Sequence, residues 1–372
     1  MQLSAQTGIT VGILGTGRMA RLHGIALKHL REEGGITVNG ETWPVDIALY
    51  GRDPVKVAAL AQEIGIRRTS TDLNAFIDDP DIHVIDNCLI NSLHYEPLLR
   101  AVRNGKHAFT DKPLTIHLHE AEHLLEEARK AGVHHGIIQN MRFAAGPARA
   151  REILQSGELG RVFHVRLVFG YFVPQRVTNR PAWFYQKEAA GGGIVHDMMA
   201  HFFDLLRYMI GPIQSIYCAT EIFFPEREDA EGHRFKVEVE DSAAVILRFT
   251  NGALGDIFAS WVRHKHEEIP FIEIDCEKGG LLCTFTKLHV QRVEEGGLFR
   301  YDPTQVQEGY GEGWTPIELA YRDPIYVQLK EFLTGIATGK PVKPDWEDAV
   351  INQRLIEAAY ESAEKGCRVV VS

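Results

Sequence analysis

Residues 9–20 read ITVGILGTGRMA, an apolar run that leads directly into a glycine turn. The run Ile9–Leu14 predicts a buried strand, and the segment after the turn predicts a helix to about Arg31. The pattern G-x-G-x-x-A between them is typical of dinucleotide binding, because the glycines permit a tight turn and the close approach of a pyrophosphate. The amide groups and the dipole of the helix N-terminus then favour this anion. The residues expected to bind it are Gly15, Thr16, Gly17, Arg18 and Met19. A glycine turn kept for packing alone is the alternative.

Strand and helix patterns alternate with short loops as far as residue 138, which predicts a parallel, doubly wound sheet of the Rossmann type. A hairpin around Asn39-Gly40 is expected to interrupt this alternation. Ligands of such sheets lie beyond the carboxyl ends of the strands. Further cofactor contacts are therefore expected at or next to three strand ends. They are Asn91, His94, Asp111, Lys112 and Asn140.

The end of the second strand bears on which dinucleotide is bound. A dinucleotide-binding fold usually places an Asp or Glu there to bind the adenine ribose hydroxyls. Here the position holds Gly51, and Arg52 follows it. An uncharged residue leaves room for a 2′-phosphate and an Arg attracts one, so NADP is slightly favoured over NAD. Alternatively, Arg52 is only solvated, or Asp53 binds the ribose.

The segment Asp111-Lys112-Pro113 follows a predicted strand, and Pro113 keeps Lys112 out of a helix. A lysine held at a strand end beside a cofactor can polarise a hydroxyl or carbonyl oxygen, or relay its proton. A solvated loop lysine is the alternative.

Residues 191–204 read GGGIVHDMMAHFFD and predict a glycine turn that begins a helix ending near Gly211. One narrow polar line, Asp197, His201 and Asp204, lies on this otherwise apolar helix at spacing i, i+4, i+7. Such a line fits a helix that is packed on both sides and has one edge open to a cleft. Histidine transfers protons near neutral pH, and a carboxylate one turn away can orient it. A core histidine satisfied by a neighbouring Asp is the alternative.

Residues 171–185 read as a loop rich in aromatic and Arg side chains. Aromatic rings stack on the C–H faces of sugars and Arg binds hydroxyl groups, so the loop could cover a sugar. The expected substrate contacts outside the helix are Arg142, Arg180 and Trp183. A loop used for packing or subunit contact is the alternative.

After Gly211, strand patterns follow one another without helices, which predicts an antiparallel sheet. The segment 225–233 is acidic and polar and reads as a loop. With helices on one face of the sheet only, the other face stays open, and a large flat face often becomes a subunit interface. A homodimer or homotetramer is therefore expected.

The chain has 372 residues, of which 45% are hydrophobic and 24% charged, which predicts a globular protein of two domains. Residues 1–141 are expected to bind the nucleotide, with the segment 346–372 near them, and residues 142–345 to serve substrate binding and oligomerisation. A net charge of −10 argues against a nucleic-acid or anionic-membrane partner. The sequence contains neither an apolar run of transmembrane length nor a signal-peptide pattern. Its 5 scattered cysteines favour a reducing cytoplasm without disulfides or a metal site.

The sequence resembles the Gfo/Idh/MocA family of oxidoreductases over nearly its whole length. The resemblance rests on GTGRMA at 15–20, DKP at 111–113, QNMRF at 139–143 and GGGIVHDMMAHFFD at 191–204. It implies a Rossmann domain followed by an α/β domain with an open, mainly antiparallel sheet. It also implies transfer of hydride between NAD(P) and a secondary hydroxyl of a sugar, polyol or glycoside. By this likeness Lys112 is the family lysine, Asp197 the active-site acid and His201 the proton-transfer histidine.

The sequence departs from the family pattern at three places. Asp111 replaces the usual Glu, Leu89-Ile90 replaces the usual Thr-Pro on the nicotinamide side, and Gly51 replaces the ribose-binding acid. Two other functions remain open: a glycoside-processing enzyme that keeps and recycles its NAD(H), and a non-catalytic nucleotide sensor. The Lys–Asp–His set argues against the sensor, which has no need of a proton path.

Overall fold

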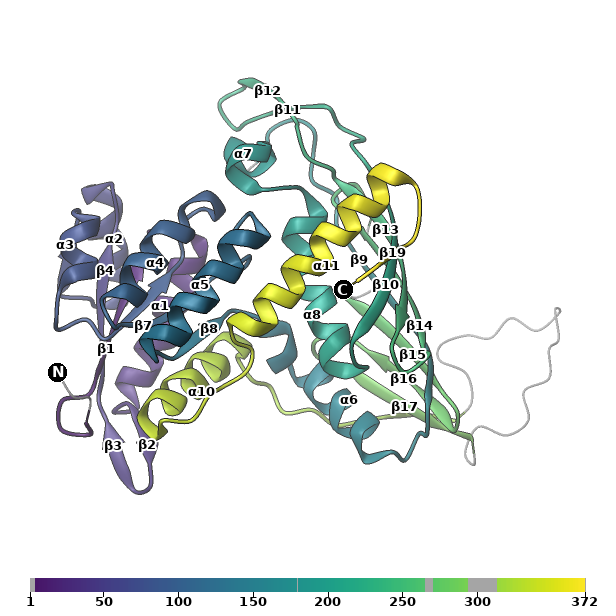
Figure 1. The fold of residues 1–372 in the computed structure, drawn as a ribbon, viewed down its shortest axis with the longest axis horizontal. Helices are drawn as coiled ribbons and strands as arrows, with labels where there is room; N and C mark the ends of the chain where they lie inside the picture. Colours follow the sequence, from purple (N-terminus) through teal and green to yellow (C-terminus); the bar gives the residue numbers. More distant parts are fainter. Residues whose placement is uncertain (1–3, 179, 265–269, 294–312, 372) are drawn as a thin grey trace. The chain divides into compact units, whose positions relative to one another are not determined.

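The computed structural model describes residues 4–178, 180–264, 270–293 and 313–371. The chain divides into two compact units (Figure 1). The first comprises Met1–Asn140, Lys187–Gly191 and Asp323–Arg354, and the second comprises Met141–Gln186, Gly192–Arg322 and Leu355–Ser372. Each unit has its own sheet and its own hydrophobic core.

The first unit is built on a six-stranded sheet in the order β5-β4-β1-β6-β7-β8. Its strands are β1 (Ile9–Leu14), β4 (Val45–Tyr50), β5 (Arg68–Ser70), β6 (Val84–Asn87), β7 (His107–Thr110) and β8 (His135–Ile137). All five pairings are parallel, which confirms the predicted doubly wound sheet. The order reverses around β1, so the carboxyl ends of β1 and β6 flank the position where such sheets bind ligands.

Helices cover this sheet on both faces. They are α1 (Arg18–Glu32), α2 (Pro54–Ile64), α3 (Leu73–Asp78), α4 (Tyr95–Arg103), α5 (Leu118–Ala131), α10 (Pro324–Thr338) and the first part of α11 (Trp346–Lys365). The short helix α7 (Lys187–Ala190) also belongs to the first unit. One core cluster joins α1, α2 and α10 to the sheet, and another joins α4, α5 and α11 to it. The predicted hairpin is present as β2 (Ile36–Val38) and β3 (Glu41–Trp43), with positive φ at both turn residues, Asn39 (52°) and Gly40 (85°).

The second unit is built on a nine-stranded sheet in the order β18-β17-β16-β15-β9-β14-β13-β10-β19. Its strands are β9 (Val162–Gly170), β10 (Ile213–Glu221), β13 (Ser242–Phe249), β14 (Leu254–Ser260), β15 (Phe271–Cys276), β16 (Gly279–Cys283), β17 (Leu288–Arg292), β18 (Trp314–Pro316) and β19 (Val369–Val370). Only the β14–β9 pairing is parallel among these strands, so the sheet is mainly antiparallel, as expected.

Helices α6 (Ala145–Ser156) and α8 (Ala200–Met209) and the second part of α11 pack on one face of this sheet, in a single apolar cluster (Figure 1). On the other face, register places side chains in rows across the strands, such as Tyr217, Ile246 and Asp256. Several of the large apolar side chains in these rows are exposed, including Ile246 at 59%.

Two details differ from the sequence-based expectation. The segment expected to be a loop, residues 225–233, contains the short strand β11 (Glu226–Glu228), which pairs with β12 (Arg234–Lys236). The helix expected after the glycine turn begins with a π-helical turn, Val195–Met199, before α8. Charged and polar three-residue strands lack the apolar alternation that identifies a strand, and a π turn has no residue preference of its own.

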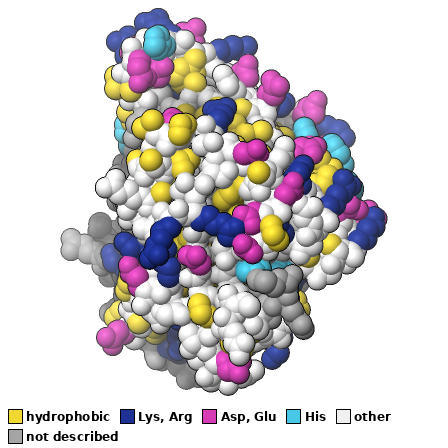
Figure 2. All heavy atoms as spheres, turned by 90° about the vertical axis from the view of Figure 1, so that its left-hand side faces the viewer, with side chains coloured by type: hydrophobic (Ala, Val, Ile, Leu, Met, Phe, Trp, Pro, Cys, Tyr) yellow, Lys and Arg dark blue, Asp and Glu magenta, His cyan; other side chains and the backbone are white. Residues whose placement is uncertain are grey.

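The surface in Figure 2 shows basic and acidic side chains interspersed over the face in view, with apolar side chains between them. In the described ranges, no helix combines the length and the apolarity that crossing a membrane requires.

Candidate functional site

The glycine turn between β1 and α1 leaves the start of α1 open. Gly15 has φ of +113°, and a Cβ there would lie 2.8 Å from the carbonyl oxygen of Cys88. Gly17 precedes the helix, is exposed, and would meet no described atom within 4 Å if it carried a Cβ. No side chain of the described residues caps α1. The first amide groups of this 15-residue helix can therefore receive an anion, so the residues present fit the pyrophosphate of a dinucleotide.

The end of β4 has no room for the usual ribose-binding acid. A Cβ at Gly51 would lie 2.6 Å from both Thr16 and Val57. The nearby Asp53 caps α2, since one carboxylate oxygen accepts hydrogen bonds from the amides of Val55 (2.9 Å) and Lys56 (3.3 Å). Arg52, which lies between Gly51 and Asp53 in the sequence, is exposed. Neither Arg52 nor Arg18 of the adjacent glycine turn has a hydrogen bond or ion pair in the described contacts, and both are exposed, so their charges are available to a ribose phosphate.

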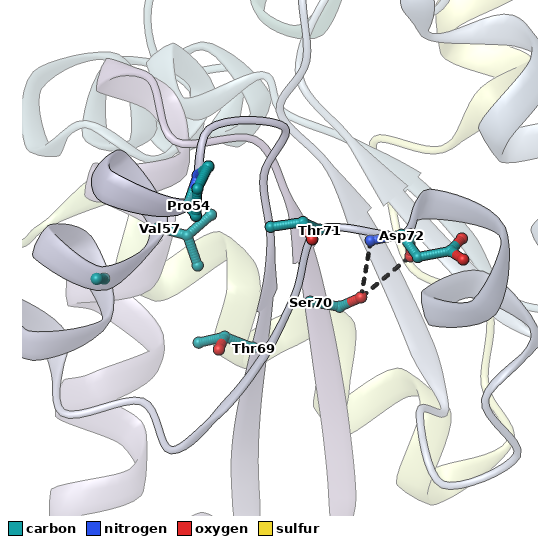
Figure 3. Close-up of a pocket in the computed structure, with 7 residues that line it drawn as sticks. Pro54, Val57, Thr69, Ser70, Thr71 and Asp72 are labelled. Carbon is teal, nitrogen blue, oxygen red and sulfur yellow. Dashed lines mark hydrogen bonds between the residues drawn. The ribbon is translucent and has the colours of Figure 1, made fainter.

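A pocket of about 430 Å³ lies beside this strand end (Figure 3). Its lining residues are Pro54, Val57, Ala58, Thr69, Ser70, Thr71 and Asp72. The Ser70 hydroxyl is tied to the backbone of Asp72, donating to its carbonyl (3.1 Å) and accepting from its amide (3.0 Å). The pocket combines apolar carbon with hydroxyl groups at the place where a Rossmann sheet receives the adenosine end of a dinucleotide.

His94 joins the loops that follow β6 and β7. The buried ring lies with Nδ1 2.7 Å from the carbonyl of Pro113 and Nε2 3.1 Å from that of Leu89. Burial lowers the pKa of His94, against the opposing effect of Asp111 and the two carbonyls. We assign the proton of the neutral ring to Nδ1, which makes the shorter bond. His94, a predicted cofactor contact, thus holds the loop that carries Lys112.

The other predicted residues at these strand ends have defined places in the first unit. The Asp111 carboxylate accepts a hydrogen bond from the Lys112 amide at 2.8 Å, and both side chains are half-buried. Asn91 donates from its side-chain amide to the carbonyl of Ala190 at 2.8 Å. Asn140 is half-buried at the start of a 3-10 turn, Asn140–Phe143.

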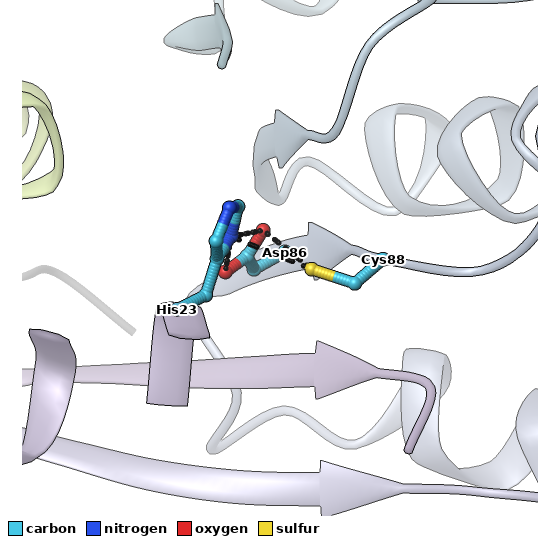
Figure 4. A group of neighbouring side chains, drawn as sticks. All are labelled: His23, Asp86 and Cys88. Atoms are coloured by element: carbon cyan, nitrogen blue, oxygen red, sulfur yellow. Dashed lines mark hydrogen bonds and ion pairs between the residues drawn. The ribbon is translucent and has the colours of Figure 1, made fainter. Parts of the chain in front are cut away.

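A buried polar cluster that sequence reasoning missed joins α1 to β6 in the first unit (Figure 4). Nδ1 of His23 on α1 lies 2.9 and 3.1 Å from the two carboxylate oxygens of Asp86 on β6, and 3.4 Å from the thiol of Cys88. Burial lowers the pKa of His23, but Asp86 and Asp111 raise it, and the net effect is a raised pKa. Nε2 of His23 has no hydrogen-bond partner among the described residues. These are metal-ligand residue types, but the ring nitrogen faces both oxygens of one carboxylate, which is the geometry of an ion pair.

In the second unit, the helix from Val195 to Met209 carries the predicted acid–base pair. Asp197 is half-buried in the π turn, and His201 is buried in the first turn of α8. The third member of the predicted polar line, Asp204, is fully buried and does not face a cleft. It accepts two hydrogen bonds of 2.5 Å each from the guanidinium of Arg142. Arg142, a predicted substrate contact, is thus engaged in a buried ion pair.

Arg180 and Trp183 lie in an aromatic group of the second unit. The Arg180 guanidinium lies 4.5 Å from the ring centre of Phe184 and 4.7 Å from that of Trp261, and donates a hydrogen bond to the hydroxyl of Tyr171. Trp183 is half-buried and packs edge-on against Phe184. Asn179 of the same loop lies outside the described residues.

Two family models match the chain. A model described as "Oxidoreductase family, NAD-binding Rossmann fold" matches residues 9–138, and a "GFO/IDH/MocA C-terminal domain" model matches residues 148–282. Among curated proteins, a D-xylose dehydrogenase from Paenarthrobacter nicotinovorans is 28% identical over 94% of each chain. A levoglucosan dehydrogenase from Pseudarthrobacter phenanthrenivorans is 26% identical over 96% of each chain.

Among solved structures, a levoglucosan dehydrogenase in complex with NADH and L-sorbose aligns with a TM-score of 0.86. The alignment covers 98% of this chain and 99% of that chain at 24% sequence identity. At this identity the likeness shows a shared fold.

Proposed function

The chain belongs to the GFO/IDH/MocA family of NAD-binding oxidoreductases, and on this premise we propose that it is a sugar or polyol dehydrogenase. It would interconvert a secondary hydroxyl and the corresponding ketone of a sugar, polyol or glycoside. The observation that carries the proposal is the N-terminus of α1, which follows a glycine turn and has open space at Gly17. Relatives named as D-xylose and levoglucosan dehydrogenases support the substrate class.

Each residue proposed for the reaction has a distinct role. Gly15–Met19 hold the pyrophosphate against the start of α1. The nicotinamide, when bound, accepts or supplies the hydride. His201 takes the proton of the substrate hydroxyl, and Asp197 assists it as a carboxylate on the same helix. The Lys112 ammonium donates a hydrogen bond to the substrate oxygen and stabilises the negative charge that develops there. Arg142, Arg180 and Trp183 remain proposed substrate contacts.

The test removes the proposed acid–base groups one at a time. We expect His201→Ala and Lys112→Ala each to lower the rate of hydride transfer at least about 100-fold, the range of general acid–base catalysis. The measurement is absorbance of the reduced nicotinamide in a single turnover, with a panel of D-xylose, levoglucosan, D-glucose and myo-inositol. His233→Ala and Lys236→Ala change an exposed histidine and an exposed lysine and serve as matched controls. Unchanged hydride transfer in both active-site variants would refute the assignment.

We propose NADP as the slightly preferred cofactor, with NAD as the other. The absence of space for an acid at Gly51, the capping role of Asp53 and the exposed Arg52 support a 2′-phosphate partner. We expect Arg52→Ala to raise the dissociation constant of NADPH about 10-fold and to leave that of NADH within about 2-fold, as measured by nicotinamide fluorescence. Equal weakening of both cofactors would contradict the proposal.

We propose that the chain forms a homodimer or homotetramer through the open face of the nine-stranded sheet. Ile246, Phe258 and Leu254 are exposed there at 59%, 40% and 44%. Apolar side chains on a flat sheet face are typical of a subunit interface. We expect the double variant Ile246→Arg, Phe258→Arg to sediment as a monomer, in contrast to the wild-type chain. A wild-type chain that sediments as a monomer would rule the assembly out.

We also propose a cytoplasmic location. All five cysteines are free thiols, and four of them are buried, as expected where thiols stay reduced.

A further inference from the structure

We infer that Glu240 is a positioning residue for Asp197 and His201, because it fixes the backbone at the start of the helix that carries them. The inference rests on the proposed function of this pair. Glu240 lies 45 residues from Val195 in the sequence and just before β13, and its role has no local sequence signal.

Three consecutive amide groups at the helix start are bonded to this one residue. Oε1 of Glu240 accepts from the amides of Gly193 (3.1 Å) and Val195 (3.0 Å). The backbone carbonyl of Glu240 accepts from the amide of Ile194 between them (3.0 Å). The first amides of a helix have no partner within the helix itself, so Glu240 acts as an N-cap from a segment distant in the sequence.

The same contacts lead directly to Asp197. The carbonyl of Gly193 accepts the amide of Asp197 at 2.9 Å, so the residue held by Glu240 also fixes the backbone of the proposed acid. Asp197 lies in the π turn, a less common geometry that often occurs at functional sites and needs support from its surroundings.

Tyr360 on α11 completes the arrangement. Its hydroxyl donates to Oε1 of Glu240 at 2.8 Å, so three donors converge on a single carboxylate oxygen. Burial raises the pKa of Glu240, and the bonds from these donors oppose that effect. A buried carboxylate needs such donors to offset the loss of its hydration. The three bonds therefore form together only when the backbone at the helix start lies in this one position.

The packing explains why the helix starts with glycines. A Cβ at Gly193 would overlap the carbonyl of Glu240, and a Cβ at Gly192 would overlap the hydroxyl of Tyr360. Both glycines are therefore required by the close approach of Glu240 and Tyr360.

The test compares Glu240→Ala, Glu240→Gln and Tyr360→Phe. A shift of about 1 Å in a reacting group can cost about 100-fold in rate, so we expect Glu240→Ala to lower kcat about 100-fold. The NADH dissociation constant should stay within about 2-fold. Glu240→Gln keeps an acceptor oxygen and should recover at least about 10-fold of the loss, and Tyr360→Phe should lower kcat about 3- to 10-fold. The substrate is D-xylose or levoglucosan, whichever the wild-type chain oxidises faster.

Hydrogen exchange provides a readout that needs no substrate. Amides in the peptide 191–199 should exchange faster in Glu240→Ala than in the wild-type chain, with the peptides of β1 and α1 unchanged. Glu238→Ala, an exposed residue two positions earlier, is the matched control and should change neither exchange nor kcat.

The outcomes separate this inference from the proposed function. If Glu240→Ala and Glu240→Gln lose stability but retain wild-type kcat per cofactor-loaded molecule, Glu240 is structural only and the inference is overturned. If His201→Ala retains hydride transfer, the proposed catalytic pair is wrong whatever Glu240 does. If Glu240→Ala does not fold, the test rests on Glu240→Gln and Tyr360→Phe. A kcat in both variants equal to that of the wild-type chain would then contradict the inference.

Discussion

Arg142 and Asp204 form an ion pair that is almost fully buried in the second unit. The side chains are 8% and 1% exposed, and the guanidinium also lies 5.0 Å from the ring centre of Tyr208. Two parallel hydrogen bonds to one carboxylate use the planar geometry that Lys cannot reproduce. The two opposite charges neutralise each other inside the protein. The pair therefore links the segment after β8 to the helix that carries His201.

Removal of one member of the Arg142–Asp204 pair should lower the free energy of unfolding more than removal of both. Asp204→Ala leaves a buried guanidinium without its carboxylate and should lower the free energy of unfolding by about 3–5 kcal/mol. The double variant Arg142→Met, Asp204→Leu replaces the pair by apolar side chains. Its free energy of unfolding should be closer to that of the wild-type chain than is that of Asp204→Ala. Thermal unfolding of the two single variants and the double variant measures the coupling. Additive losses would show that the pair does not act as a unit.

The His23–Asp86 pair predicts a pH dependence of stability. The net pKa of His23 is raised in the folded chain, so its contribution is complete below the unfolded value of about 6.5. The contribution is lost as pH rises through the raised, folded pKa. His23→Gln should therefore lower the free energy of unfolding by about 3 kcal/mol at pH 5.5. This difference in stability from the wild-type chain should become smaller towards pH 9. Thermal midpoints at four pH values test this, and a difference independent of pH would contradict it.

At the scale of elements, the sequence predicted what local patterns determine. Apolar runs, the Asn39-Gly40 turn and the glycines after helices each act within a few residues, so helices and strands of the first unit follow from them. The G-x-G-x-x-A turn is also local, and it predicted an open helix start that fits a pyrophosphate.

Long-range contacts account for what was missed. Glu240 and Tyr360 act on residues far away in the sequence, and the segment around Glu240 reads as an ordinary charged loop. The burial of Asp204 depends on Arg142, 62 residues earlier, which no helical periodicity can reveal. The roles of Asn91 and His94 were likewise set by carbonyl groups of other loops.

The two glycines of the dinucleotide turn should respond in opposite ways to the same substitution. Gly15→Ala is strained by its positive φ and by the carbonyl of Cys88, so it should lower the thermal midpoint by several degrees. Gly17→Ala has space and an ordinary φ of −81°, so stability should be retained. Its methyl group stands where a pyrophosphate would approach, and the dissociation constant of NADH should rise about 10-fold. Loss of stability in Gly17→Ala without weaker binding would contradict this division.

At the scale of the whole molecule, the chain passes between the two units several times. The first unit consists of three separate segments, and helix α11 begins in the first unit and ends in the second. Helix α10 follows strand β18 of the second unit's sheet in sequence but packs within the first unit's core. Gln328 on α10 is bonded to both Ile137 and Gln139, at 2.7 and 3.0 Å. The Rossmann unit is therefore not encoded by the first 140 residues alone.

A fragment of residues 1–140 should consequently fail to fold as a stable domain. It lacks five buried side chains of α10, which are Ile325, Leu329, Phe332, Leu333 and Ile336. At about 1.5–3 kcal/mol for each buried side chain, their loss removes an amount comparable to the whole stability of a domain, about 5–15 kcal/mol. Joining residues 323–354 to the fragment through a flexible linker should restore cooperative thermal unfolding and NADH binding, measured by circular dichroism and fluorescence. A scrambled 323–354 segment of equal composition is the control. Cooperative unfolding of the 1–140 fragment by itself would show that α10 covers this core without being needed to form it.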